Sequence, residues 1–151
     1  MSNKRNIELF IVDVFVAIKK VDNYTIRFNN PSDFQHSSLH WDATMRQLEI
    51  IGEALNKLLD DKKFKLIAPS YFRKIVNFRN AIAHGYFGID LDEVWNIITH
   101  KLTVLNDDLK NLVKNSIDIS EAIACEIEEY RLLEDMEIVK YLAFVLVEVE
   151  K

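Results

Sequence analysis

Apolar residues recur at intervals of three and four over four long stretches of this 151-residue chain, and this spacing limits the fold more than any other feature. Such spacing places one apolar stripe along each of several amphipathic helices. The expected helices cover residues 4–27, 31–60, 69–85 and 90–112. Only three Gly and two Pro are present, too few for the many tight turns of a sheet-rich fold. The sequence therefore predicts an all-α protein, an antiparallel four-helix-type bundle with short connections.

Capping signals support these boundaries. Asn30 before Pro31 is a start signal, because proline suits the first helical position. The run 90–93, Asp-Leu-Asp-Glu, resembles a capping box, and Gly85 and Gly88 bracket the end of the third helix. The lysine-rich stretch 61–65 is expected to be a connector.

Charge divides the chain near residue 115. Residues 1–115 hold 16 Lys and Arg against 14 Asp and Glu, a balance of +2, whereas residues 116–151 hold 3 against 10, a balance of −7, and the two sum to −5. We therefore expect a bundle over 1–115 and an acidic C-terminal extension, 116–151, packed on the same domain. The near-neutral body permits a nucleic-acid partner without indicating one.

The secondary structure of the extension is predicted as helical. Asp118–Glu121 can cap a helix that runs through Tyr130. Residues 140–151 fit a helix by length, although alternating valines also fit a strand. Helix is favoured because everything before this segment is helical.

The remaining composition suggests a soluble, cytoplasmic protein. The single Cys125 has no partner for an internal disulfide, as in a reducing compartment, and is expected to be a buried filler and not a nucleophile. The longest charge-free apolar run near the C-terminus, 141–147, falls far short of the roughly 20 residues of a membrane span. Glu8 and Asp13 interrupt what would be a signal-peptide core.

Arg79 and His84 are the side chains with the clearest chemical potential. On an ideal helix about 140° and roughly 7.5 Å of rise separate residues five apart, so the two share no stripe but both can reach a cleft near the helix end. Arginine grips phosphate oxygens bidentately, and histidine exchanges a proton near neutral pH. A histidine that removes the proton of an RNA 2′-OH, beside an arginine that stabilises the crowded phosphorus, would cleave RNA without a metal. On spacing alone, a helix-end cation and a surface charge are the more common explanation.

Three blocks of sequence give this pair more weight. Residues 79–86 read Arg-x4-His-x-Tyr, residues 43–54 include Arg46, Leu48-Glu49 and Ile51-Gly52-Glu53-Ala54, and residues 88–95 contain Gly-Ile-Asp followed by Val-Trp. In this order they resemble the HepT-like toxins of the HEPN superfamily, over roughly residues 5–115. The chain departs from the family pattern at Phe72-Arg73, where Trp-Arg is common, and at Asn77-Phe78, where Gly-Met is common. We interpret both as packing changes.

The resemblance implies an all-α HEPN bundle that forms a homodimer, with two Arg/His motifs facing one cleft. It implies a metal-independent endoribonuclease, with Arg79 and His84 catalytic, that leaves cyclic phosphate ends and needs no cofactor. It also implies that a cognate minimal nucleotidyltransferase, the antitoxin, silences this toxin by attaching AMP to Tyr86. A non-catalytic helical subunit that binds nucleotide or the nucleotidyltransferase is the alternative.

Several polar residues around the motif have two interpretations each. Arg46, Glu49 and Glu53 lie at i, i+3 and i+7 on one helix face. They form either a surface ladder of ion pairs or, as the resemblance implies, a polar face toward the cleft where a glutamate orients Arg79 or His84. Asn80 is expected to support its neighbour Arg79.

Other candidates are weaker. His36 and His40 are four residues apart but have no convincing third ligand, so no metal site is predicted. His100 is expected to be solvated. Lys62, Lys63 and Lys65 either contact an RNA backbone or, more simply, form a solvated loop.

Overall fold

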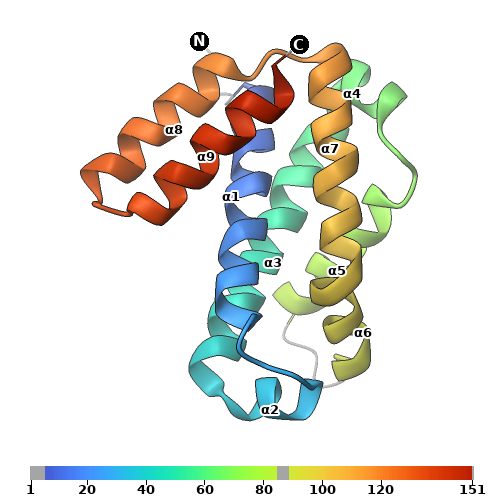
Figure 1. The fold of residues 1–151 in the computed structure, drawn as a ribbon. Helices are drawn as coiled ribbons and strands as arrows, with labels where there is room; N and C mark the ends of the chain where they lie inside the picture. Colours follow the sequence, from blue (N-terminus) through green and yellow to red (C-terminus); the bar gives the residue numbers. More distant parts are fainter. Residues whose placement is uncertain (1–5, 85–88, 151) are drawn as a thin grey trace.

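Every regular element in the described part of the chain is helical, and the prediction of an all-α fold is confirmed. The computed structural model describes residues 6–84 and 89–150 (Figure 1). Its helices are α1 (Ile7–Thr25), α2 (Pro31–His36), α3 (Ser38–Leu59), α4 (Lys62–Ile67), α5 (Phe72–Ala83), α6 (Leu91–Asn96), the π-helical segment η1 (Ile97–Lys101), α7 (Leu102–Ser116), α8 (Ser120–Leu132) and α9 (Met136–Val149).

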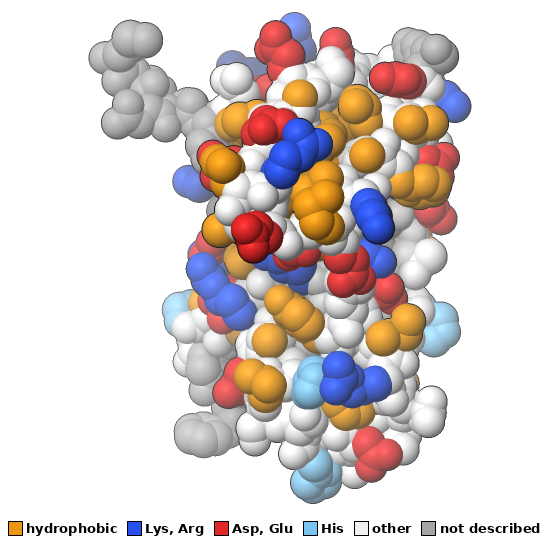
Figure 2. Space-filling view, turned by 60° about the vertical axis from the view of Figure 1, so that its left-hand side comes forward, with side chains coloured by type: hydrophobic (Ala, Val, Ile, Leu, Met, Phe, Trp, Pro, Cys, Tyr) orange, Lys and Arg blue, Asp and Glu red, His pale blue; other side chains and the backbone are white. Residues whose placement is uncertain are grey.

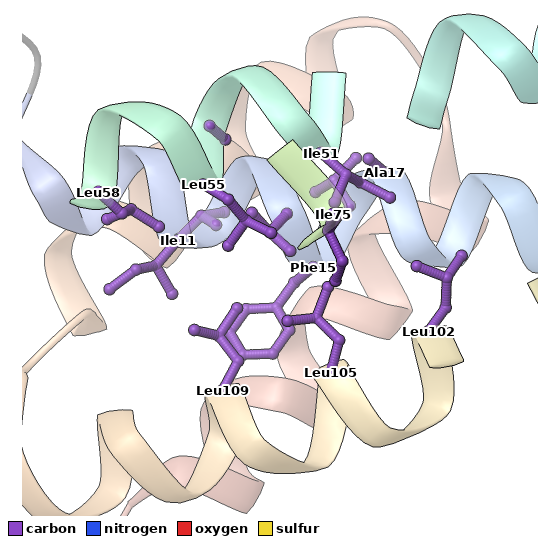
Figure 3. Packing of buried hydrophobic residues seen from close by; sticks show 14 of the residues in the cluster. Ile11, Phe15, Ala17, Ile51, Leu55, Leu58, Ile75, Leu102, Leu105 and Leu109 are labelled. Carbon is purple, nitrogen blue, oxygen red and sulfur yellow. The ribbon is translucent and has the colours of Figure 1, made fainter. Parts of the chain in front are cut away.

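The core lies between α1, α3, α5 and α7. Phe15 of α1, Leu55 of α3 and Leu105 of α7 are fully buried and point toward one another from three helices (Figure 3). Burying a side chain of this size contributes about 1.5–3 kcal/mol. The apolar stripes that the sequence spacing predicts are thus the surfaces that hold the bundle together.

The predicted helix 31–60 is in fact two helices. The backbone leaves the helical region at Ser37, with φ −94° and ψ 89°, which separates α2 from α3. The Ser37 hydroxyl lies 2.6 Å from the His40 ring nitrogen Nδ1, and Phe34 of α2 is fully buried. The break lets Phe34 enter the core while α3 follows a direction of its own.

The predicted connector 61–65 is also wrong, because most of it belongs to α4. The Asp61 carboxylate accepts a hydrogen bond from the Phe64 backbone N–H at 2.9 Å and caps this short helix. Phe64 is 1% exposed, so its burial explains why a lysine-rich stretch folds back onto the bundle. Lys62, Lys63 and Lys65 remain exposed.

The predicted helix 90–112 contains a π turn that the spacing did not reveal. Asp90 caps α6 by accepting a hydrogen bond from the Asp92 backbone N–H at 2.9 Å. The π segment η1 adds one residue per turn, so the buried positions step from Ile97 to Leu102. Ile98, expected in the apolar seam, is only half-buried.

The acidic extension folds as a helical hairpin, α8–α9, and the helix predicted for 140–151 exists but starts earlier, at Met136. Ile123 of α8 and Leu142 of α9 are fully buried in the same apolar cluster as the bundle. At the surface, Lys110 of α7 lies 3.7 Å from Glu148 of α9. The two helices lie beside α1 and α7 at one end of the molecule (Figure 1).

The surface of the hairpin is not uniformly polar. Figure 2, with the left-hand side of Figure 1 turned forward, shows apolar side chains reaching the surface over the upper half of this face. Leu132 and Leu133, at the α8–α9 turn, are 82% and 71% exposed. Cys125 of α8 is exposed as well, which contradicts the expected burial, because it falls on the side of α8 that faces away from the bundle.

The turn between α8 and α9 offers a stabilising substitution. Glu134 has φ 58°, the left-handed region that costs a residue with a Cβ about 1–2 kcal/mol. Replacing Glu134 by glycine is expected to raise the free energy of unfolding by about 0.5–1 kcal/mol, measured by urea denaturation. The same substitution at Glu137, inside α9, serves as the control and should lower stability by a similar amount.

Tyr71 and Tyr141 should make the folded protein less stable at alkaline pH. Burial, and then the hydrogen bond from its hydroxyl to Asp108 Oδ2 at 2.5 Å, raise the pKa of Tyr71. Burial, and then the nearby Asp22, raise the pKa of Tyr141. The folded protein keeps both phenols neutral, whereas the unfolded chain ionises them above about pH 10, so stability should fall as the pH rises past that value. The variant Y71F/Y141F should show a smaller drop in Tm from pH 9 to pH 11 than the wild type, and an equal drop would contradict this assignment.

No helix within residues 6–84 and 89–150 has the length and apolar character that crossing a lipid bilayer requires.

Candidate functional site

Arg79 is positioned by the crossing of α5 over α3. At this crossing Gly52 of α3 faces the base of the Arg79 side chain: a Cβ on Gly52 would clash with Arg79 Cβ and lie 2.6 Å from its Cγ. Gly52 is itself buried. Because Gly52 has no side chain, α3 and α5 can approach closely at this point, and Arg79 lies directly against α3.

Two neighbours hold the guanidinium group. Arg79 Nη2 donates to Glu53 Oε1 at 3.2 Å, and Nη1 donates to Asn80 Oδ1 at 2.8 Å. The Arg79 side chain is 28% exposed, so its stem is packed while part of its head group meets solvent. Among the described residues its Nε, which is buried, has no hydrogen-bond acceptor. The group is thus oriented from one side and keeps further N–H donors for an anion.

His84 ends the same helix. It is the C-cap residue of α5, with φ −84° and ψ 1°, and its backbone N–H donates to the Asn80 carbonyl at 3.1 Å. The residue is exposed. The structure therefore places both motif residues in the last two turns of α5, with His84 accessible to a substrate.

The charged residues of α3 have different contacts, some as in a surface ladder of ion pairs and one as in a polar face toward the motif. Arg46 and Glu49 pair with each other at 3.7 Å, with side chains 61% and 27% exposed, as in a surface ladder. Glu53 contacts Arg79, as expected for a polar face that meets the motif. Asn80 also contacts Arg79, and its supporting role stays a prediction. Tyr86 lies outside the described residues.

Two hollows flank Arg79's helix, and the sequence reveals neither, because each is assembled from separate helices. A groove of about 830 Å³ lies between α5 and the α6–η1–α7 segment, with Phe78, Ile97 and Val104 among its lining residues. A smaller pocket of about 280 Å³ lies between α1, α3 and α5 and is lined in part by Arg79 itself. His100 is exposed, as expected, but it lines the larger groove.

His36 and His40, which are four residues apart in the sequence, contact different groups. His36 Nδ1 lies 2.7 Å from the Ser32 carbonyl oxygen, and His40 Nδ1 lies 2.6 Å from the Ser37 hydroxyl. Within the described ranges no group of three His, Cys, Asp or Glu side chains is arranged to hold a metal ion.

An all-helical bundle that carries an Arg-x4-His motif on the last turns of one inner helix defines a HEPN-type protein. Comparison with known sequences gives the family: the pattern of the family described as Ribonuclease HepT-like matches residues 15–116. The chain belongs to this HepT-like ribonuclease family.

Individual relatives agree with this family. A protein of Thermococcus cleftensis named "Probable ribonuclease HepT" is 30% identical over 114 residues, which is 74% of this chain and 99% of that protein. Two proteins of Methanocaldococcus jannaschii are also similar. "Putative RNase MJ1380" is 29% identical, and the match spans 72% of this chain and 97% of that protein. "Putative RNase MJ1216" is 25% identical, and the match spans 74% of this chain and 91% of that protein. No solved structure matches the chain significantly.

The acidic hairpin, α8–α9, lies outside the family match. The family match ends at residue 116, where α7 ends, and α8 and α9 follow it. The T. cleftensis relative is matched over 99% of its length by 74% of this chain, so part of this chain lies outside that match.

Proposed function

We propose that this protein is a metal-independent endoribonuclease toxin of a toxin–antitoxin pair, acting as a homodimer and silenced by AMP on Tyr86. The observation that carries the proposal is the geometry of Arg79. Its guanidinium is fixed by Glu53 and Asn80 but stays partly exposed, one turn before the exposed His84. A guanidinium held in place one turn before an accessible imidazole offers both a cation for the phosphate and a general base, which together can cleave RNA without a metal.

The reaction follows from these two side chains. The His84 imidazole removes the proton of a 2′-OH, and the 2′-oxygen attacks the adjacent phosphorus. Arg79 stabilises the extra negative charge on the phosphate oxygens. The bond from phosphorus to the 5′-oxygen breaks, and this oxygen takes up a proton. The products are a 2′,3′-cyclic phosphate and a 5′-hydroxyl, and DNA, which lacks the 2′-OH, is not cleaved.

The homodimer is supported by the large groove on α5. The groove lies on the helix that carries the motif, and Val104 at its edge is 52% exposed. A second copy that covers this apolar surface would bury it and bring two α5 helices together. The second motif would then supply another imidazole, which can protonate the leaving 5′-oxygen.

The silencing step is supported by sequence proximity. Tyr86 follows His84 by two residues, so an AMP group on its hydroxyl would stand beside the motif. Its phosphate would satisfy the charge of Arg79 and occupy the place of the RNA phosphate. ATP would be the donor of the AMP group. The Tyr86 hydroxyl loses its proton and attacks the α-phosphorus of ATP, pyrophosphate leaves, and the cognate minimal nucleotidyltransferase catalyses this transfer.

The test is incubation of the purified protein with total tRNA and mRNA in EDTA, beside His84→Ala. Intact mass first confirms that Tyr86 carries no AMP. We expect cleavage by the wild type with cyclic phosphate ends, and a loss of about 10²–10⁴-fold in rate for the variant, the usual contribution of a general base. His84 is exposed at a helix end, so the variant should keep its Tm. An unmodified dimer that cuts neither RNA class would instead support a non-catalytic subunit that binds nucleotide or the nucleotidyltransferase.

A further inference from the structure

Helix α9 is apolar on the side that faces solvent as well as on the side that faces the bundle. Its inward side, which includes Leu142 and Val145, is fully buried. Met136, Phe144 and Val147 are exposed and lie within an arc of about 80° on an ideal helix, so they form one outward face. A surface helix normally turns polar residues outward, and a helix that is apolar on both sides is normally covered on both. The outward face of α9 is therefore a candidate contact surface for another molecule.

Acidic side chains border this outward face. On an ideal helix Glu137 and Glu150, both exposed, fall on its two edges. Lys140 also lies along the face, but residues 116–151 hold ten acidic side chains against three basic ones. Figure 2 shows apolar and acidic side chains together over the upper half of this side of the molecule. RNA and anionic lipid carry the same sign of charge as the hairpin and are disfavoured, whereas a basic protein surface with an apolar centre fits.

The chain itself carries a surface of this kind at α4. Residues 57–74 hold six Lys and Arg against two Asp, a balance of +4. Phe64 of α4 is buried, and Leu66, which is 86% exposed, points away from the bundle. Three exposed lysines lie around Leu66 on the same short helix, namely Lys62, Lys63 and Lys65. The α4 surface, an apolar side chain among cations, is thus complementary to the outward face of α9, apolar side chains among acids.

The positions of the two surfaces point to contact between molecules. Figure 1 shows α4 on one side of α7 and the α8–α9 hairpin on the other. Within one molecule the two surfaces therefore face different directions, and a second copy is needed to bring them together. Two hairpins are poor partners for each other, because each has a balance of −7 and like charges repel.

We propose that the outward face of α9 docks on α4 of a second copy of this chain. Leu66 of one copy packs against Phe144 and Val147 of the other, and the lysines of α4 meet the acidic edges of the face. Because the two surfaces differ, the contact joins copies head to tail, and further copies can add. The inference goes beyond the proposed function and holds whether or not the protein cleaves RNA, since α4 and α9 line neither of the two hollows beside α5.

The contact should be weak and sensitive to salt. Helix α4 has only six residues, and an interface of this size belongs with transient contacts. A dissociation constant on the order of 10–100 μM is expected for such a contact. The screening length falls from about 10 Å at 0.1 M salt to about 3 Å at 1 M, so the attraction between lysines and acids should be lost at 1 M.

The first experiment is analytical ultracentrifugation of the purified full chain over a range of about 5–500 μM, which brackets that constant. We expect the average mass to rise with concentration at 0.1 M NaCl, above the mass that the same protein has at 1 M. A mass that does not change with concentration at 0.1 M would overturn the proposal.

Two charge-reversed variants test which surfaces meet. One carries Lys62→Glu, Lys63→Glu and Lys65→Glu, and the other carries Glu137→Lys and Glu150→Lys. Neither should assemble alone, because in each the two surfaces carry the same sign of charge. An equal mixture should assemble again, since acidic α4 then meets a basic hairpin and basic α4 meets an acidic one. All these positions are exposed, so each variant should keep the Tm of the wild type within a few degrees.

The mixture separates the proposed contact from any other self-association. If both variants assemble as the wild type does, the copies meet elsewhere, for example through the large groove on α5, and the proposal is wrong. If the mixture stays unassembled while both variants are folded, the charges act in another way and the proposal is equally wrong.

A matched pair of apolar substitutions tests the centre of the contact. Val147→Ser removes an exposed apolar side chain from the outward face of α9 and should weaken assembly by about fivefold or more. Leu39→Ser removes a similarly exposed apolar side chain from α3 and should leave assembly unchanged. Equal effects of the two substitutions would contradict docking on α9.

Discussion

Replacing Gly52 by alanine is expected to remove most ribonuclease activity and to lower the free energy of unfolding by about 1–3 kcal/mol. The new Cβ would clash with Arg79 Cβ, an atom fixed to the backbone of α5, so no side-chain rotation relieves it. One helix must shift, and Arg79 then leaves its hydrogen bond to Glu53. A displacement of about 1 Å at a catalytic group costs roughly 10²-fold in rate. RNA cleavage rates and urea denaturation measure the two effects.

A double-mutant cycle shows whether the clash is the cause. Arg79→Gly removes the Cβ and Cγ that Gly52→Ala would meet, at about 1 kcal/mol for a glycine inside a helix. In the Arg79→Gly background, Gly52→Ala should therefore cost far less stability than in the wild type, while activity stays absent. Additive costs would mean that the two residues do not meet, and the described crossing of α3 and α5 would be wrong.

This glycine illustrates what the sequence can and cannot predict. Residue 52 is visible in the sequence as part of an Ile-Gly-Glu-Ala block that resembles the HepT-like family. Its physical role depends on where α5 crosses α3, which no local pattern contains. The apolar stripes, in contrast, follow from spacing within one helix, and residues such as Phe15 and Leu105 are buried as the spacing predicts.

The errors in the helix boundaries have a common cause, namely tertiary contacts that override local signals. The lysines of 61–65 suggest a solvated connector, but burial of Phe64 makes the segment helical. Ser37 breaks a stretch whose apolar spacing looks continuous, so that Phe34 can enter the core. At η1 a single extra residue in one turn moves the buried position from Ile98 to Ile97, a change too small for spacing to show.

The same limit applies to the site. Helical spacing puts Glu49 and Glu53 on one face of α3, but only the position of α5 decides that Glu53 contacts Arg79 while Glu49 pairs with Arg46. The pocket that includes Asp13 is assembled from three helices. In the sequence Asp13 is merely an interruption of an apolar run, and its place in this pocket becomes visible once α1 lies beside α3.

Replacing Arg79 by lysine is expected to lower the rate of RNA cleavage by about 10²–10³-fold, close to the effect of removing a transition-state donor outright. Lysine keeps the charge and the stem that packs on Gly52, so the free energy of unfolding should change by less than about 1 kcal/mol. It lacks the planar fork, however, and its single nitrogen cannot contact Glu53 and Asn80 while presenting two parallel donors to a phosphate. Single-turnover cleavage rates in EDTA measure the loss, and circular dichroism confirms the fold.

The hairpin provides the matched control for this substitution. Arg131 of α8 pairs with Glu128 at 2.7 Å, an ion pair comparable to Arg79–Glu53, but it lies beyond the family match. Arg131→Lys should leave the cleavage rate unchanged within about twofold, since an exposed ion pair of this kind contributes little. If Arg79→Lys cleaves as fast as Arg131→Lys, charge alone suffices at position 79. The hydrogen bonds that Arg79 donates to Glu53 and Asn80 would then position Arg79 for packing and not for catalysis.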